Sequence, residues 1–451
     1  MGSLFGTDGV RGVANLAPMD SETVMRLGRA AAHVFRRSEG RHRILIGKDT
    51  RVSGYMLETA LCSGLSSMGV DVLLVGPLPT PGVAFMTRSM RADAGVMISA
   101  SHNPYEDNGI KFFGADGFKL PDETEAEIER LMEPGHLDEL RADPHLIGKA
   151  ARIEDAIGRY TVYLKSCVER EANFEGVKIV IDNANGAAYK VAPLVFSELG
   201  ADLIIVGDEP NGRNINDGCG STHPEVISEK VREHGADAGI AYDGDADRVI
   251  FCDEKGEVVD GDLLLAICAL DFKARGILQG GGVVGTVMSN LGLEVALNKE
   301  GIELHRSSVG DRYVLAEMLE RGINLGGEQS GHLISLDHNT TGDGILSSLL
   351  VLSVMLRDNK PLSSYRTLLT PYPQLLINVQ VTSKPPLTDL PKVRSAIAAA
   401  EDRLGKRGRV LVRYSGTEKK ARVMVECEDD AMCKEVAEEI AAAIKQEIGA
   451  K

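Results

Sequence analysis

The hydrophobic pattern predicts three rounds of alternating strands and helices. Short apolar, β-branched runs typical of buried strands alternate with segments whose apolar residues recur at helical spacing. Predicted strands cover 44–46, 72–75, 96–98, 177–181, 203–206, 239–242, 283–287 and 303–306, and predicted helices cover 53–65, 82–89, 187–199, 224–234, 291–299 and 311–320. Strands separated by such helices form βαβ units, so mixed and mostly parallel sheets are expected.

The C-terminal segment follows a different pattern. Residues 410–413 and 422–426 are predicted to pair as strands around a tight loop, with a helix over 431–448 and a Pro-containing linker at 370–373. At roughly 150 residues per domain, a chain of 451 residues suggests about three domains, with two to four all reasonable. We therefore expect three related α/β domains and a smaller C-terminal α+β domain, at 1–153, 154–256, 257–369 and 370–451.

Composition restricts the partners and the compartment. The net charge is −16 and the chain has no dense Lys/Arg run, which argues against nucleic acid. Its 7 cysteines are scattered and form no CxxC pair, as in reduced cytosolic proteins. The N-terminus lacks a secretory pattern, and the most apolar stretch, 345–356, is too short to span a bilayer. We expect a cytoplasmic protein without nucleic-acid or membrane partners.

Three unusual loops each follow a short apolar strand, which for the third loop is the segment 323–325. They read SASHNP from residue 99, DGDADR from residue 243 and GEQSGH from residue 327. In open α/β sheets, ligands bind beyond the carboxyl ends of the strands, and large sites often lie between domains. We therefore expect these loops to converge on one cleft.

The DGDADR loop predicts a metal site. Asp243, Asp245 and Asp247 alternate with small residues, and in an extended chain such side chains point the same way. The small residues between them are expected to leave room for a ligand. Hard carboxylate oxygens suit Mg²⁺, which also tolerates phosphate among its ligands.

The SASHNP loop offers a nucleophile. Ser101 lies beside His102 in a loop stiffened by Pro104. Taken alone, the loop could equally be a simple turn leading out of a strand. With the three aspartates, a phosphate on Ser101 becomes a natural additional ligand for Mg²⁺, which would neutralise the phosphoryl oxygens.

Two further loops are suited to a phosphorylated sugar, although each alone could be a polar turn. The guanidinium group of Arg413 can donate two parallel hydrogen bonds to phosphate oxygens. The hydroxyl and backbone N–H groups of Ser415, Gly416 and Thr417 can form an anion-binding nest. In the GEQSGH loop, the carboxylate, amide and hydroxyl groups can bond sugar hydroxyls.

Together these motifs resemble the α-D-phosphohexomutases, in that family's order and over essentially the whole chain. The resemblance implies three related α/β domains and a fourth smaller one. It also implies that Ser101 is the phosphoserine and a metal ligand together with Asp243, Asp245 and Asp247. The other site residues it implies are Arg11 (in the motif 7–12), His102, Lys111 and Arg248 for catalysis, and Glu328, Ser330, His332, Arg413, Ser415, Gly416, Thr417 and Arg422 for the substrate.

Within the family, GEQSGH and the following LDHNTTGDG resemble members that act on glucosamine phosphates. The expected reaction interconverts glucosamine 6-phosphate and glucosamine 1-phosphate, supplying UDP-N-acetylglucosamine synthesis. It is expected to need one Mg²⁺ per site and to pass through glucosamine 1,6-bisphosphate, with movement of the C-terminal domain. The chain departs from the family pattern in three places: Tyr414 replaces a frequent Pro, Lys419-Lys420-Ala421 replaces more apolar residues, and Ser308 replaces a frequent Lys.

Several alternatives stay open at this stage. Another hexose phosphate could be the substrate, as in phosphomannomutase/phosphoglucomutase, and a non-catalytic sugar-phosphate-binding protein is a rival from another class. The absence of Trp and the aromatic content of 4% disfavour that rival. The general acid or base could be His102, Lys111, Arg11 or His332, and Gln329 or His332 could read the C2 substituent. A homodimer also stays open.

Overall fold

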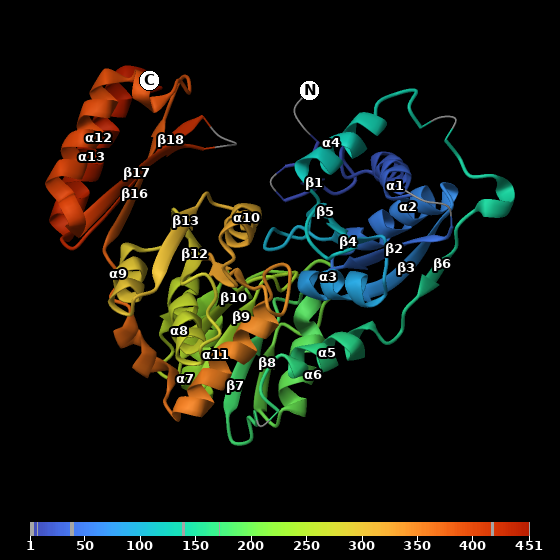
Figure 1. Ribbon diagram of the computed structural model, residues 1–451, viewed down its shortest axis with the longest axis horizontal. Helices are drawn as coiled ribbons and strands as arrows, with labels where there is room; N and C mark the ends of the chain where they lie inside the picture. Colours follow the sequence, from blue (N-terminus) through green and yellow to red (C-terminus); the bar gives the residue numbers. More distant parts are fainter. Residues whose placement is uncertain are drawn as a thin grey trace.

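The computed structural model describes residues 4–6, 8–36, 40–137, 140–170, 172–415 and 419–450. Four sheets succeed one another along the chain, three in α/β domains and one in a smaller C-terminal domain (Figure 1). The predicted fold class is confirmed, while the exact domain boundaries stay predictions.

The first domain carries a six-stranded sheet in the order β1-β5-β4-β2-β3-β6. Strands β4, β2, β3 and β6 run parallel, and β5 and β1 add to one edge in antiparallel pairing. The elements are β1 (Val10–Val13), α1 (Ser21–Phe35), β2 (His42–Lys48), α2 (Ser53–Ser67), β3 (Val70–Pro77), α3 (Thr80–Ser89), β4 (Ala94–Ile98), β5 (Asp107–Gly114), α4 (Asp122–Leu131) and β6 (Ala150–Arg152).

The second and third domains repeat this arrangement with smaller sheets, ordered β11-β10-β9-β7-β8 and β13-β12-β14-β15. The second contains α5 (Ala156–Ser166), β7 (Lys178–Asp182), α6 (Val191–Glu198), β8 (Asp202–Val206), α7 (Pro224–His234), β9 (Ala238–Tyr242), β10 (Val249–Asp253) and β11 (Val258–Val259). The third contains α8 (Gly261–Ala274), β12 (Gly282–Thr286), α9 (Leu291–Lys299), β13 (Glu303–Ser307), α10 (Asp311–Arg321), β14 (Leu325–Gly327), β15 (Leu333–Ser335) and α11 (Gly344–Asp358).

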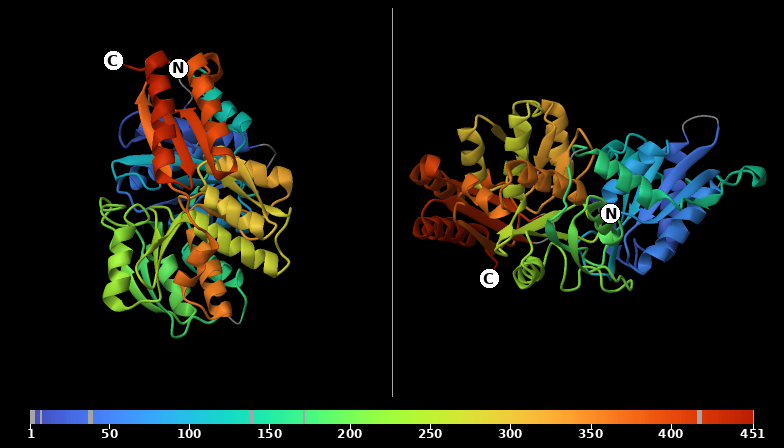
Figure 2. Two further views of the ribbon diagram at one scale, coloured as in Figure 1. Left: turned by 90° about the vertical axis from the view of Figure 1, so that its left-hand side faces the viewer. Right: turned by 90° about the horizontal axis from the view of Figure 1, so that it is seen from below.

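The C-terminal domain packs as a unit of its own. Its antiparallel sheet, ordered β16-β18-β17, is covered by two helices, and its core is separate from the continuous core that spans the first three domains. Figures 1 and 2 show it beside the third domain and away from the first. Its elements are β16 (Gln374–Gln380), α12 (Pro391–Leu404), β17 (Gly408–Tyr414), β18 (Lys420–Cys427) and α13 (Asp430–Ile448).

A small set of polar contacts joins the third and fourth domains. The side chain of Asn290, which caps α9, accepts from the N–H of Tyr372 at 2.8 Å and donates to its carbonyl at 3.0 Å. Arg409 of β17 donates to the carbonyls of Val287 at 2.9 Å and Ser289 at 2.7 Å. These bonds connect the fourth domain to the start of α9, while the two cores stay separate.

Helices α8 and α11 were not predicted because most of their residues are buried, so no polar face marks the helical period. The apolar stretch noted in the sequence is α11, which lies within the shared core. None of the helices in the described ranges is long and apolar enough to cross a membrane.

Candidate active site

The three predicted loops meet at one pocket of about 520 Å³. Each begins where a strand ends: the Ser101 loop after β4, the Asp243 loop after β9 and the Glu328 loop after β14. The pocket is lined by Leu4, Gly6, Asp8, Gly9, Arg11, His102, Asp247, Arg248, Val309, Gly310, Asp311, Glu328, Ser330 and His332. These residues come from the first three domains.

Ser101 is held in an unusual backbone conformation, with φ at +53°. A left-handed conformation costs a non-glycine residue roughly 1–2 kcal/mol, so the surroundings must hold it. The N–H of Ser101 donates to Ser99 Oγ at 2.9 Å. Its carbonyl accepts from Arg51 at 3.2 Å and from Asn216 at 2.9 Å. These bonds fix the buried hydroxyl at the base of the loop.

The Ser101 hydroxyl reaches directly into the aspartate loop. Its Oγ donates to Asp243 Oδ2 at 2.5 Å and lies 3.3 Å from His102 Nδ1. Gly244 makes the close approach of the two loops possible, because a Cβ there would lie 2.5 Å from the Ser101 carbonyl oxygen. The small residue at 244 therefore accommodates the Ser101 loop, where we had expected it to leave room for a ligand.

The three aspartates converge, but not through an extended chain as we expected. Strand β9 ends at Tyr242, and the loop then turns, with the N–H of Ala246 donating to the Asp243 carbonyl at 3.1 Å and Ala246 at φ +56°. One oxygen from each of the three carboxylates lies within 4.8 Å of the others. A turn brings them closer than the side-chain alternation of a strand could.

The charges in this cluster fit a cation. Burial and the nearby Asp247 and Asp245 raise the pKa of Asp243 well above its ordinary value. Oδ1 of Asp245 and Oδ1 of Asp247 are buried and have no hydrogen-bond partner among the described residues. Buried, unpaired hard oxygens are unfavourable unless a cation or donor joins them, so this donor set suits a metal such as Mg²⁺.

Lys111 lies at the edge of the cluster and is also buried. Its Nζ lies 2.9 Å from Asp245, 3.2 Å from Asp8 and 3.4 Å from Asp247. Burial favours the neutral amine, but these carboxylates outweigh it and raise the pKa of Lys111 well above its ordinary value. The Lys111 ammonium group in turn helps to lower the pKa of Asp245, although burial of that carboxyl group acts in the opposite direction.

Three more groups suited to a phosphate line the pocket. Arg11 pairs with Asp8, and Arg248 Nε lies 3.9 Å from Asp247 Oδ1. Burial and the two arginines lower the pKa of His102, which favours the neutral imidazole. The pocket therefore presents arginine side chains beside the Ser101 loop.

The GEQSGH loop presents Glu328, Ser330 and His332 to the same pocket. Glu328 Oε1 accepts from the N–H of Gly310 at 3.1 Å, which joins this loop to the start of α10. Both ring nitrogens of His332 are buried without a hydrogen-bond partner in the described part of the chain. Gln329 instead donates to Asp260 at 3.2 Å and does not line the pocket, so His332 is the better candidate for reading the substrate.

The predicted phosphate clamp lies in the fourth domain and does not line this pocket. Arg413 and Arg422 face each other in register across β17 and β18. Burial and the nearby Arg422 lower the pKa of Arg413, because each makes the charged guanidinium less favourable. The Ser415 carbonyl accepts a hydrogen bond from Lys384 Nζ at 2.5 Å. Gly416 and Thr417 of the predicted clamp lie outside the described residues, as does Thr7 of the N-terminal motif.

Sequence patterns did not identify several residues around the site. Thr80 donates to Asp245 Oδ2 at 2.6 Å, although 165 positions separate the two residues. Lys384 lies in an irregular segment with no motif. Asp8 lies within the 7–12 motif, and its place in that motif was the only feature of the sequence that pointed to it. Lys119 and Asp311 belong to the same charged network as Asp8.

Family models match nearly the whole chain. Four consecutive domains of phosphoglucomutase/phosphomannomutase match: alpha/beta/alpha domains I, II and III over residues 2–138, 158–256 and 260–372, and the C-terminal domain over 376–443. The chain therefore belongs to the phosphoglucomutase/phosphomannomutase family.

Three relatives that match along nearly their full length are named phosphoglucosamine mutase. The proteins of Citrifermentans bemidjiense and Geobacter metallireducens are each 58% identical, over 100% of this chain and 99% and 100% of theirs. The Myxococcus xanthus protein is 58% identical over 98% of this chain and 97% of its own.

Solved structures share the fold. A phosphoglucomutase/phosphomannomutase family protein of Burkholderia thailandensis matches with a TM-score of 0.83 and 24% identity, covering 98% of this chain and 97% of its own. The N-acetylphosphoglucosamine mutase of Aspergillus fumigatus, solved with GlcNAc-6P and magnesium, matches with a TM-score of 0.68 and 18% identity, covering 98% and 95%.

Proposed function

We propose that this protein is a phosphohexomutase that interconverts glucosamine 6-phosphate and glucosamine 1-phosphate through a phosphorylated Ser101. The observation that carries the chemistry is the 2.5 Å hydrogen bond from Ser101 Oγ to Asp243, which joins a nucleophile to a carboxylate cluster suited to a cation. The names of the relatives at 58% identity support the choice of substrate within the family.

The reaction consists of two transfers that leave the enzyme unchanged overall. Phospho-Ser101 first gives its phosphoryl group to the O1 hydroxyl of glucosamine 6-phosphate. A new P–O1 bond forms as the bond to Ser101 Oγ breaks, and the hydroxyl proton passes to a base. The resulting 1,6-bisphosphate reorients, and Ser101 Oγ takes the phosphoryl group from O6. A proton returns to O6, which leaves glucosamine 1-phosphate and phospho-Ser101.

The chain's own residues would orient these groups. Asp243, Asp245 and Asp247 would hold Mg²⁺, as a magnesium ion is present in the Aspergillus fumigatus complex. When bound, the ion would neutralise charge on the phosphoryl oxygens. Arg11 and Arg248 would hold the transferring phosphoryl group, and His102 lies 3.3 Å from the nucleophile at its Nδ1. His102, Lys111, Arg11 and His332 all remain candidates for moving the proton.

The non-reacting phosphate would bind in the fourth domain. Arg413, Arg422, Ser415, Gly416 and Thr417 would form that site. The pocket beside Ser101 is lined by the first three domains, so the fourth domain must approach it when substrate binds. Its separate core and few polar contacts to α9 are compatible with such a movement.

Glu328 and Ser330 would bond sugar hydroxyls, but these are largely shared by glucosamine, glucose and mannose. His332 is the candidate for reading C2, because its ring nitrogens are buried and unpaired among the described residues. A site that pairs with the C2 nitrogen leaves a polar group unmatched when glucose phosphate binds. The seven cysteines are free in the structure, which suits a reducing cytoplasm, and dimerisation stays a prediction.

The test is a comparison of kcat/KM for the 1-phosphates of glucosamine, glucose and mannose. We expect the highest value for glucosamine 1-phosphate and weaker activity with glucose 1-phosphate. Equal or higher efficiency with glucose or mannose 1-phosphate would contradict the substrate assignment. Absence of turnover with all three would contradict the enzymatic function.

A further inference from the structure

Lys119 bridges carboxylates from two domains at the rim of the active-site pocket. Its Nζ donates to Asp8 Oδ1 at 2.6 Å and also to Asp311, the first residue of α10. Lys119 follows β5 in the first domain, whereas Asp311 belongs to the third, 192 positions away. The side chains of Lys119 and Asp311 are only 12% and 16% exposed. The bridge is thus largely shielded from water and from screening salt.

The Asp311 carboxylate also faces His332. Its Oδ2, the oxygen that accepts from Lys119, lies 3.6 Å from His332 Nε2. That separation is too long for a hydrogen bond. Gly342 lies against the His332 ring, and a Cβ at position 342 would come within 2.4 Å of Nε2. The imidazole is therefore confined, and the position of the Asp311 carboxylate decides what its Nε2 can bond.

The same bridge holds the loop that leads into α10. The N–H of Gly310, next to Asp311, donates to Glu328 at 3.1 Å, and Gly310 has φ at +126°. Val309, Gly310 and Asp311 all line the pocket. Lys119 therefore fixes a loop that contacts both Glu328 and His332, although it does not line the pocket itself.

We propose that Lys119 is a positioning residue for the mutase reaction, which acts by holding Asp311 and thereby places His332 toward the sugar phosphate. The inference rests on the proposed function and assigns a role to a residue outside the family motifs discussed above. Without Lys119, the freed carboxylate would either bond Nε2 directly or turn to solvent. Either change alters the proton donor or acceptor that His332 offers to the substrate.

The electrostatics of the bridge agree with this geometry. Burial would favour the neutral forms, but Asp311 and Asp8 raise the pKa of Lys119, and Lys119 and His332 lower the pKa of Asp311. Both groups are therefore charged throughout the physiological range. The bridge stays formed there and does not depend on a change in protonation.

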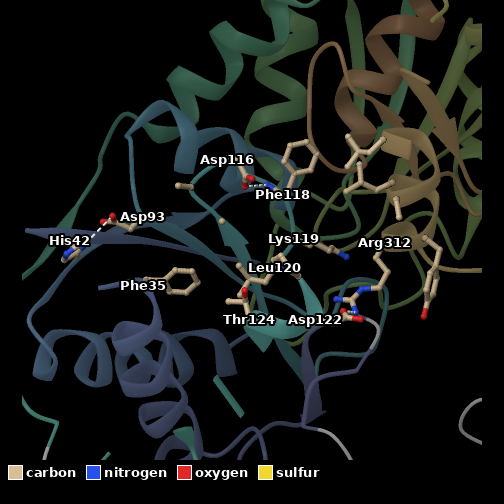
Figure 3. A pocket seen from close by; sticks show the side chains of 17 residues that line it. Phe35, His42, Asp93, Asp116, Phe118, Lys119, Leu120, Asp122, Thr124 and Arg312 are labelled. Carbon is tan, nitrogen blue, oxygen red and sulfur yellow. Dashed lines mark hydrogen bonds and ion pairs between the residues drawn. The ribbon is translucent and has the colours of Figure 1, made fainter. Parts of the chain in front are cut away.

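The same domain boundary offers a matched control. Arg312 pairs with Asp122 at 2.7 Å and with Glu125 at 3.2 Å, again linking α10 to the first domain. Arg312 and Asp122 line a second pocket of about 970 Å³, which Lys119 also lines, and Figure 3 shows Arg312 against Asp122 with Lys119 nearby. Arg312 does not line the active-site pocket, so its loss weakens the domain contact without releasing Asp311.

The experiment measures kcat/KM for Lys119→Met, alone and in a His332→Ala background, with Arg312→Met and Lys119→Arg as controls. We expect Lys119→Met to lose roughly tenfold or more, and Lys119→Arg to recover most of that loss. In the His332→Ala background, Lys119→Met should change kcat/KM by less than about twofold, because residues that act as a unit are not additive. Arg312→Met should change kcat/KM by less than about twofold relative to its parent protein, whether that parent is wild type or His332→Ala.

An equal loss from Lys119→Met with and without His332 would overturn the inference, as would an equal loss from Arg312→Met. If His332→Ala is too slow to measure, Asp311→Asn serves as the background, and Lys119→Met must again add nothing. Failure of the proposed function is distinguishable, because the wild-type protein would then lack turnover with every hexose phosphate tested.

Discussion

Lys111→Met should destabilise the protein strongly in chelator and less strongly in Mg²⁺. Lys111 is 2% exposed and lies within 3.4 Å of three carboxylates, those of Asp245, Asp8 and Asp247. Methionine fills a similar volume but removes the cation. The carboxylates would then be left buried beside Asp243 with less positive charge to balance them.

The magnitude follows from opposing terms. Each pair at about 3 Å contributes roughly 5 kcal/mol of attraction at an effective dielectric constant near 20. Desolvation of the buried charges offsets most of this, and removing one partner of a buried ion pair typically costs about 3–5 kcal/mol. For a unit of 150–250 residues, that cost corresponds to a fall in Tm of roughly 6–20 °C. Because one core spans the first three domains, the unit that unfolds is larger and the fall should lie at or below the lower end of this range. Bound Mg²⁺ would supply the missing positive charge and recover part of the loss.

The assay is thermal unfolding of wild type and variant in excess chelator and in excess Mg²⁺. Lys48→Met is the matched control, because Lys48 is 2% exposed in the same domain and pairs with Glu58 at 2.6 Å, away from the aspartate cluster. The loss of thermal stability in Lys48→Met should be the same in chelator and in Mg²⁺. The reasoning is refuted if Mg²⁺ raises the Tm of Lys111→Met no more than that of wild type, or if Lys111→Met costs less than about 1 kcal/mol.

Three further predictions concern other parts of the molecule. The intact mass of active wild-type enzyme should include one phosphate, and Ser101→Ala should lose both this phosphate and the mutase activity. Full activity of Ser101→Ala would exclude a covalent route. Arg413→Ala should lower kcat/KM roughly ten- to a hundredfold, equally for the 1-phosphate and 6-phosphate, and a defect with one substrate alone would argue for another role. Burial and the nearby Asp260 raise the pKa of Asp262 from 3.8 to about 7. The folded state therefore holds more protons than the unfolded state between these values, and stability falls as pH rises through them. Asp262→Asn should gain stability over wild type above pH 7, by at most about 4 kcal/mol. A difference in unfolding free energy between Asp262→Asn and wild type that is the same at pH 5 and pH 8 would contradict this.

The strands and loops that hold the site were predictable because their signals are local. Apolar β-branched runs mark β2, β4, β7 and β12, and each functional loop follows such a strand or one like it. The antiparallel edge pair β1 and β5 gave no comparable signal. Its residues 107–109, Asp-Asn-Gly, suggest a turn, and their place in a strand depends on pairing with β1 nearly 100 positions earlier.

The sequence indicated which residue types could form the site but not how they are arranged. Alternation singled out Asp243, Asp245 and Asp247, which the structure brings into one cluster, but it does so through the turn at Ala246, whose φ of +56° depends on tertiary contacts. The bridge from Asp8 through Lys119 to Asp311 spans 111 and 192 positions. Single charged residues so far apart show no pattern in a sequence, because only the packing of the first domain against the third brings them into contact.

Transfer of the Ser101 phosphate to the sugar can be followed directly with an isotopic label. Enzyme carrying an ¹⁸O-labelled phosphate on Ser101 is mixed with unlabelled glucosamine 6-phosphate, and both protein and sugar phosphates are analysed by mass spectrometry. We predict that the label leaves the protein and appears in glucosamine 1-phosphate and the bisphosphate, while Ser101 acquires unlabelled phosphate. Formation of glucosamine 1-phosphate while the label remains on Ser101 would contradict the phosphoserine mechanism.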